Sequence, residues 1–112
     1  MHDVYIKFLQ IIETLEPPLL KNLSPTALFL LNKIAVKDFM KQQLNVSQLM
    51  EFKSLGSPAN LHLKLDELRH ADLVLVTNIG TDRRTKYVFL TQIAKDYFQI
   101  YSNAMLQAVE SK

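Results

Sequence analysis

The chain has 112 residues, enough for one domain with a single core. Its 48% hydrophobic and 21% charged residues are ordinary for a globular protein and argue against disorder. Cys is absent, and the three histidines lie in no metal-ligand pattern, so we expect no disulfide, metal or cofactor. A net charge of +2 is too small for nucleic-acid binding through bulk charge alone. No apolar run approaches the ~20 residues that span a bilayer, and no signal pattern opens the chain, so we expect a cytoplasmic protein without a membrane partner.

Prolines and a cap bound the first two expected helices. Apolar residues at helical spacing predict a helix over about 3–15, which Pro17 and Pro18 end. Ser24 as N-cap and Pro25 at the first helical position begin a second helix of roughly 18 residues, which we expect at the centre of the core. The first helix fits a core helix and a subunit-contact helix equally well.

The middle of the chain predicts a helix-turn-helix. Residues 44–46 form a possible short strand, and Ser47 is expected to cap a helix of about two turns. Gly56 falls where that helix would end in the left-handed conformation. Ser57 and Pro58 then begin a second helix, whose buried face carries the leucines at 61, 65 and 68. Two helices joined by a tight turn that contains glycine form this motif.

A β-hairpin and a long helix complete the chain. "LVLVTN" and "TKYVFL" read as strands around the loop "IGTDRR", and Thr91 is expected to cap a helix to about 109. The apolar stripe of that helix is too wide for a helix lying on one side of a small domain. We therefore expect a mainly α protein with a small β-hairpin (α+β), a winged helix-turn-helix. Its single domain, 1–112, would comprise an N-terminal helix (1–20), the core (24–91) and a C-terminal dimerisation helix (92–110).

The segment from Ser57 to Thr91 resembles the winged-helix transcription factors of the multiple-antibiotic-resistance regulator (MarR) type. The resemblance rests on the capped second helix, the Leu65/Leu68 pair, Asp82-Arg83-Arg84 at the wing tip and Val88-Phe89-Leu90-Thr91. The chain departs from the family pattern at Asp72, where a glycine is usual, and in its short helical dimerisation region. The resemblance implies a DNA-binding transcription regulator that is a homodimer, is located at the nucleoid and can respond to a small-molecule effector.

The second helix and the wing carry the candidate DNA-binding residues. A helix in the major groove contacts base edges mainly through its N-terminal half. Within helix 57–71 this selects Ser57, Ala59, Asn60, His62, Leu63 and Lys64. In the wing, 79–86, arginine suits a narrow minor groove or the phosphate backbone, which selects Arg83, Arg84 and Lys86. Asp82 would either pair with an arginine or cap the turn.

The modest charge predicts that DNA binding needs two copies. Between Ser57 and Tyr87 the sequence has five Lys or Arg and four Asp or Glu, a net charge of only +1. A two-fold dimer would place two second helices about one duplex turn apart and favour a pseudo-palindromic site. The terminal helices supply the candidate dimer contacts, which are Phe8, Ile12, Tyr97, Ile100, Tyr101 and Met105.

Protein–protein interaction is the alternative function, and catalysis is not expected. The same fold serves as a protein–protein interaction module or a subunit of a larger complex that does not read DNA, and the weak charge keeps this alternative open. No nucleophile–base grouping, phosphate-binding glycine loop or metal cluster is visible in the sequence, so we expect no enzyme.

Overall fold

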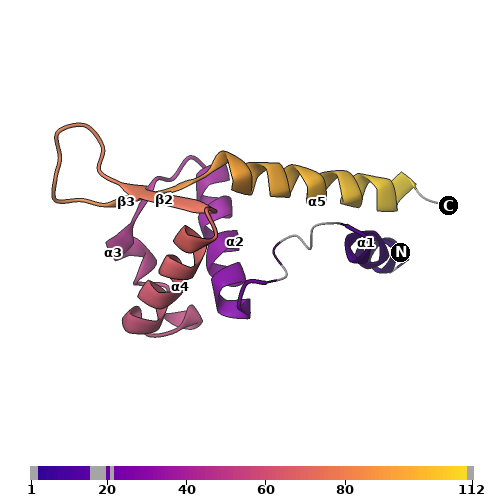
Figure 1. The fold of residues 1–112 in the computed structure, drawn as a ribbon, viewed down its shortest axis with the longest axis horizontal. Helices are drawn as coiled ribbons and strands as arrows, with labels where there is room; N and C mark the ends of the chain where they lie inside the picture. The colour runs from indigo at the N-terminus through magenta and orange to yellow at the C-terminus, as the bar shows by residue number, and fades with distance from the viewer. Residues whose placement is uncertain (1–2, 16–19, 21, 111–112) are drawn as a thin grey trace. The chain divides into compact units, whose positions relative to one another are not determined.

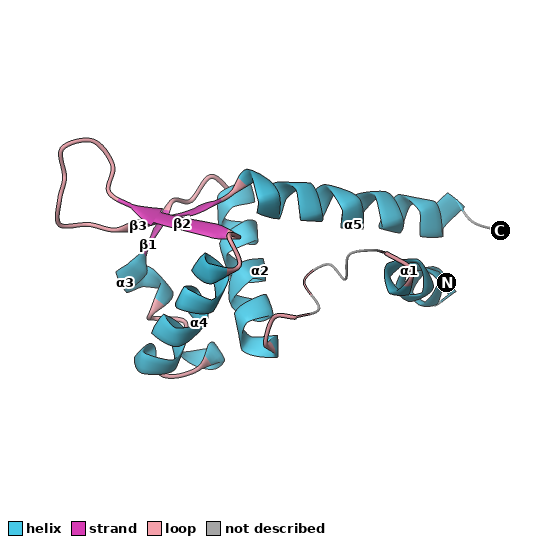
Figure 2. Cartoon of the chain, viewed as in Figure 1, coloured by secondary structure: helices cyan, strands magenta, loops and turns pink. Residues whose placement is uncertain are grey.

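The computed structural model describes residues 3–15, 20 and 22–110. The helices are α1 (Asp3–Glu13), α2 (Pro25–Phe39), α3 (Val46–Leu49), α4 (Pro58–His70) and α5 (Gln92–Glu110), with a short 3-10 helix η1 (Lys53–Leu55). The strands are β1 (Leu44–Asn45), β2 (Val74–Thr77) and β3 (Tyr87–Leu90) (Figures 1 and 2). The chain divides into two compact units, one of residues 23–94 and one of the described residues outside that range. The first unit is the expected winged helix-turn-helix.

The two core helices begin and end in the same way. Ser24 and Ser57 are the N-caps of α2 and α4, and each hydroxyl oxygen accepts a hydrogen bond from a backbone N–H three residues later. At the other end, Lys41 and Asp72 adopt left-handed φ angles of 59° and 60°. This conformation lets the N–H groups of Asp72 and Leu73 donate to Arg69 and Leu68, so the last carbonyls of α4 are paired. Asp72 thus takes the backbone conformation for which a glycine is usual.

The first helix of the helix-turn-helix differs from its prediction. Its N-cap is Asn45, and the prediction that Ser47 caps it is wrong. Asn45 Oδ1 accepts a hydrogen bond from Gln48 N at 2.8 Å, and Gln48 Oε1 accepts one from Asn45 N at 2.9 Å. These two bonds form a capping box that satisfies backbone N–H groups without an intrahelical partner, and they start the helix two residues earlier than expected. Gly56 follows η1 with φ 144° and ψ −176°, so the predicted left-handed helix end is also wrong.

A three-stranded antiparallel sheet attaches the wing to the helix-turn-helix. The strand order is β1-β3-β2. Val88 in the central strand β3 pairs with Leu44 of β1 on one side and with Val76 of β2 on the other. The N–H of Val46, the first residue of α3, donates to Lys86 O at 2.9 Å. Thr91 caps α5 by accepting from Ala94 N, and its hydroxyl donates to Asp72 O at 2.7 Å. The ends of the wing strands are therefore tied to both α3 and the end of α4.

Leucines of α2, α3 and α4 and of the residue before β2 form most of the core of the winged-helix unit. α4 packs on α2 and β2, and α2 also packs on β3. The largest fully buried side chains are Leu30, Leu31, Leu49, Leu61, Leu68 and Leu73. Burying one leucine is worth about 2 kcal/mol, so this cluster fixes how α4 is presented.

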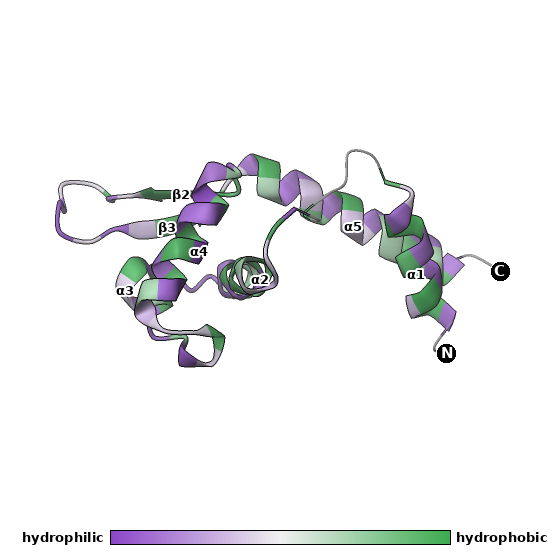
Figure 3. Ribbon diagram, turned by 60° about the horizontal axis from the view of Figure 1, so that its bottom comes forward, coloured by the Kyte–Doolittle hydropathy of each residue, from purple (hydrophilic) through white to green (hydrophobic). Residues whose placement is uncertain are grey.

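The second unit contains α1 and most of α5. Figure 3 shows apolar segments in green along both helices. Only small residues of α5 are buried there, Ala104 and Ala108, while no residue of the fully described α1 is buried. Large apolar side chains of both helices are exposed, among them Tyr5, Ile6, Met105, Leu106 and Val109. A chain that exposes this much apolar surface on two helices has surface available for another protein.

Candidate nucleic-acid interface

Helix α4 has one buried and one open face, as the leucine spacing predicts. Leu61, Leu65 and Leu68 are buried, whereas Ala59, His62, Leu63, Asp66 and His70 are exposed. Leu63 is 65% exposed, and a leucine this open on the face opposite the core is available to touch an apolar group of a ligand. Asn60 and Lys64 are half-buried at the edges of the open face.

Three of the candidate residues on α4 have structural contacts of their own. Ser57 is used as N-cap, accepting from Asn60 N at 3.2 Å. The side chain of Asn60 lies over Gly56, where an added Cβ would come within 3.0 Å of Asn60 Nδ2. Lys64 Nζ lies 3.8 Å from Glu67 Oε1. The exposed His62 and Leu63 therefore have the most freedom to meet a groove.

Glu67 fixes the second helix of the motif to the core, a role that sequence reasoning missed. Its carboxylate accepts two hydrogen bonds from the N-cap of α2, from Ser24 N at 2.7 Å and from Ser24 Oγ at 2.8 Å. The backbone hydrogen bond from Ser24 is the main reason that the pKa of Glu67 lies below its ordinary value, with the Ser24 hydroxyl and Lys64 adding to the effect against partial desolvation. Forty-three residues separate the partners, so nothing in the local sequence signals the contact.

Hydrogen bonds within the loop brace the wing. Asp82 Oδ1 accepts from Arg84 N at 2.8 Å and from Thr85 N at 3.4 Å, which caps the turn. The hydrogen bond from Arg84 N is the leading cause of the lowered pKa of the Asp82 carboxyl. Asn78 Nδ2 donates to Thr85 O at 2.7 Å across the base of the loop, and Gly80 supplies a positive φ of 60°.

Three cationic side chains lie on the wing. Arg83, Arg84 and Lys86 are all exposed. Lys86 Nζ donates to Asn78 Oδ1 at 3.1 Å, so it is held at the base of the loop. In Figure 1 the loop extends beyond the strands at the end of the sheet away from the β3–α5 junction. A loop that is braced by the side chains of Asp82 and Asn78 and carries two adjacent exposed guanidinium groups is suited to a phosphate-rich surface.

Solved structures share this fold. A MarR-like transcriptional regulator from Thermotoga maritima matches with a TM-score of 0.70 at 22% identity, over 97% of this chain and 74% of its own. A second transcriptional regulator from Thermotoga maritima matches with a TM-score of 0.66 at 11% identity, over 96% and 68%. The MarR family regulator AbsC from Streptomyces coelicolor matches with a TM-score of 0.58 at 18% identity, over 94% and 67%.

The chain has the MarR-type winged-helix fold. No family model matches the sequence, and the comparison with curated proteins gave no match. The likeness is thus one of structure at low identity. This protein spans between two thirds and three quarters of the length of the three neighbours.

The six expected dimer residues lie on α1 and α5. Phe8, Ile12, Tyr97 and Tyr101 are half-buried, whereas Ile100 and Met105 are exposed. Burial, together with the neighbouring Tyr97, raises the pKa of Tyr101 above its ordinary value. These side chains belong to the second compact unit, separate from the winged helix.

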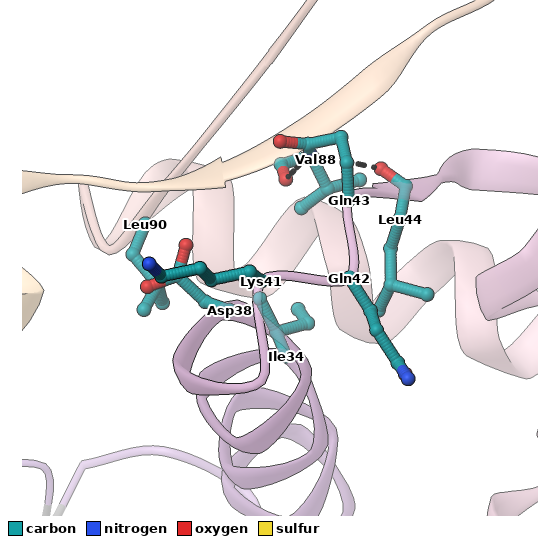
Figure 4. A pocket seen from close by; sticks show the side chains of 8 residues that line it. All are labelled: Ile34, Asp38, Lys41, Gln42, Gln43, Leu44, Val88 and Leu90. Atoms are coloured by element: carbon teal, nitrogen blue, oxygen red, sulfur yellow. Dashed lines mark hydrogen bonds between the residues drawn. The ribbon is translucent and has the colours of Figure 1, made fainter.

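A cleft of about 220 Å³ lies beside β1 and β3 in the winged-helix unit (Figure 4). Ile34, Leu44, Val88 and Leu90 line its apolar part, and Gln43, the residue before β1, donates from Nε2 to Val88 O at 2.9 Å. Across residues 3–15, 20 and 22–110, no group of three or more His, Asp or Glu is placed to hold a metal ion. None of the described helices is both long and apolar enough to cross a bilayer.

Proposed function

We propose that the protein is a sequence-specific, double-stranded-DNA-binding transcriptional regulator. One observation carries the proposal: a single leucine-packed unit holds both the open face of α4 and a braced wing with two exposed arginines. Helix α4 would enter the major groove, with the N-terminal half of its open face toward base edges. His62 can hydrogen-bond to guanine acceptors, and Leu63 and Ala59 can touch thymine methyl groups.

Phosphate contacts would come from the edges of this surface. Arg83 and Arg84 would follow the backbone or enter the adjacent minor groove, and Lys86 would contact the backbone at the base of the wing. Lys64 and the N-terminus of α4 at Ser57 would add contacts on the other side of the groove. Asn60 would reach an adenine only by moving off Gly56, which makes it a weaker candidate than His62.

The proposal includes a homodimer. The segment from Ser57 to Tyr87, which contains α4 and the wing, has a surplus of only one positive charge, so one copy would bind DNA weakly. Two linked copies on one duplex would bind much more tightly than one. The exposed apolar residues of α1 and α5, together with the half-buried Phe8 and Ile12, would form the contact. Such a regulator would act at the nucleoid in the cytoplasm. Any small-molecule effector taken by the cleft in Figure 4 would be small, because pockets for drug-sized ligands measure about 300–1,000 Å³.

A shift assay on duplex DNA at several salt concentrations tests the proposal. The variant Arg83→Ala with Arg84→Ala should bind at least tenfold more weakly than the native protein. Each lost phosphate contact should also flatten the slope of log K against log[salt] by about 0.9. The matched control, Lys33→Ala with Lys37→Ala, also removes two positive charges, but from α2, and should bind DNA as the native protein does.

The same assay distinguishes the proposal from the alternative function. If the native protein binds no duplex even at low salt, the winged helix is a protein–protein interaction module or a complex subunit. Equal losses in the wing variant and the α2 control would also contradict the proposal, because they would show that only net charge matters.

A further inference from the structure

Helix α2 is apolar on two opposite faces. Ala27, Leu30, Leu31 and Ile34 are buried in the core. Phe29 and Val36 of α2 and its C-cap Met40 are exposed at 56%, 56% and 54%. A rotation of about 100° per residue places them within about 40° of one another, roughly opposite the buried face. A helix with apolar residues on both sides normally has protein on both sides. We call Phe29, Val36 and Met40 the outer stripe.

The outer stripe borders a groove with basic residues on one side. Phe29, Asn32, Lys33 and Val36 from α2 and Leu55 from η1 line a cavity of about 310 Å³. The Nζ atom of Lys33 lies 5.9 Å from the centre of the Phe52 ring, a cation–π contact that holds the charge at the groove. Lys37 lies one turn further along the same flank, where its Nζ donates to Gln42 Oε1 at 3.2 Å and keeps two further N–H donors.

We infer that this groove binds an acidic amphipathic helix of a partner protein. The outer stripe spans about 16 Å from Phe29 to Met40, which matches about three turns of a partner helix. Apolar residues of the partner at i, i+3 or i+4, and i+7 would lie on the stripe. Carboxylates along one edge of the partner helix would face Lys33 and Lys37.

The charges argue against a second copy of this chain as the occupant. A two-fold axis that pairs two outer stripes in antiparallel fashion brings the lysine flank of one copy against the lysine flank of the other. Like charges that meet at an interface suppress that pairing, whereas an acidic partner is attracted by the same residues. The inference is independent of DNA binding, because none of these residues lies on α4 or the wing.

Fluorescence anisotropy with two designed labelled peptides tests the inference. Both peptides are three-turn helices with the same apolar positions, and they differ only in carrying Glu or Lys along one edge. The native protein should prefer the Glu peptide by about tenfold, the scale that two rim charges support. The variant Lys33→Glu with Lys37→Glu should reverse the preference. The control Lys86→Glu with Lys95→Glu has the same net charge and should keep the native preference.

A second pair of variants tests the apolar part of the surface. Val36→Asp should weaken binding of both peptides more than tenfold, and Phe29→Ser provides the same test if Val36→Asp fails to fold by circular dichroism. Equal binding of both peptides, no binding of either, or an unchanged preference in the Lys33→Glu, Lys37→Glu variant would overturn the inference. A dimer that dissociates on Val36→Asp substitution would overturn it too, because the occupant would then be a second copy.

Discussion

The contact between Glu67 and Ser24 predicts that one carboxylate sets much of the stability of the helix-turn-helix. Glu67→Ala removes both hydrogen bonds to Ser24, at 2.7 and 2.8 Å, and leaves the N-cap of α2 facing a gap. A hydrogen bond to a charged group contributes about 1.5–3 kcal/mol when well buried. The side chain of Glu67 is 30% exposed, so water replaces part of the loss, and we expect a total of about 2 kcal/mol.

The measurement is urea denaturation followed by circular dichroism at one fixed protein concentration. Glu67→Gln keeps one acceptor oxygen and should cost about 1 kcal/mol, half the loss of Glu67→Ala. The control is Asp66→Ala, one residue earlier, which breaks only the exposed pair to Arg69 at 3.4 Å and should cost less than about 0.5 kcal/mol. Equal losses for Glu67→Ala and Asp66→Ala would refute the reasoning, since the Ser24 contact would then contribute nothing.

The pH dependence of these variants follows from the lowered pKa of Glu67. A carboxylate whose folded pKa lies below its unfolded value stabilises the protein fully above the unfolded value, near 4.5. That contribution is lost as the pH falls from there through the lower folded pKa. The free-energy difference between the native protein and Glu67→Gln should therefore shrink on acidification through this range. Asp82 also has a lowered pKa, but it is present in both proteins and cancels in the difference.

Three further changes have defined outcomes. Lys41→Gly should raise the free energy of unfolding by about 1 kcal/mol in urea denaturation, because it removes a non-glycine residue from the left-handed conformation. Asp72→Gly should raise the free energy of unfolding by about half as much, since Asp tolerates that conformation better than Lys. A loss of stability in both would contradict the end geometry of α2 and α4. Asp82→Ala should leave the melting temperature almost unchanged and weaken DNA binding severalfold in a shift assay, because the turn that presents Arg84 loses its cap. Unaltered binding by Asp82→Ala would show that the braced wing is not required.

Local patterns in the sequence were enough to predict the architecture of the winged helix. The spacing of Leu61, Leu65 and Leu68, with Ser57 and Pro58 before them, predicted both the second helix and its buried face. The wing strands followed from Val and Tyr in the apolar runs on either side of a glycine-containing loop. Such signals depend on residues within about one or two turns of each other, which is why they are readable.

Features that depend on distant partners or on competing caps were not predictable in the same way. The choice of Asn45 over Ser47 as N-cap depends on Val46 pairing with Lys86 in the sheet, although the Asn45–Gln48 spacing was a usable signal. Glu67 and Ser24 are 43 residues apart, so only the folded structure brings the carboxylate beside the N-cap of α2. Asp72 departs from the family pattern in residue type, yet its φ of 60° is in the left-handed region that glycine favours.

Selection of the native protein on random duplex DNA, followed by affinity measurements on the enriched site, tests the central proposal most directly. We expect two half-sites about 10 base pairs apart. His62→Ala should relax the preference at one position of each half-site, whereas Arg83→Ala with Arg84→Ala should weaken all duplexes alike. A selection that enriches no sequence at low salt, or an enriched site whose preferences His62→Ala and Leu63→Ala leave intact, would contradict base reading by α4.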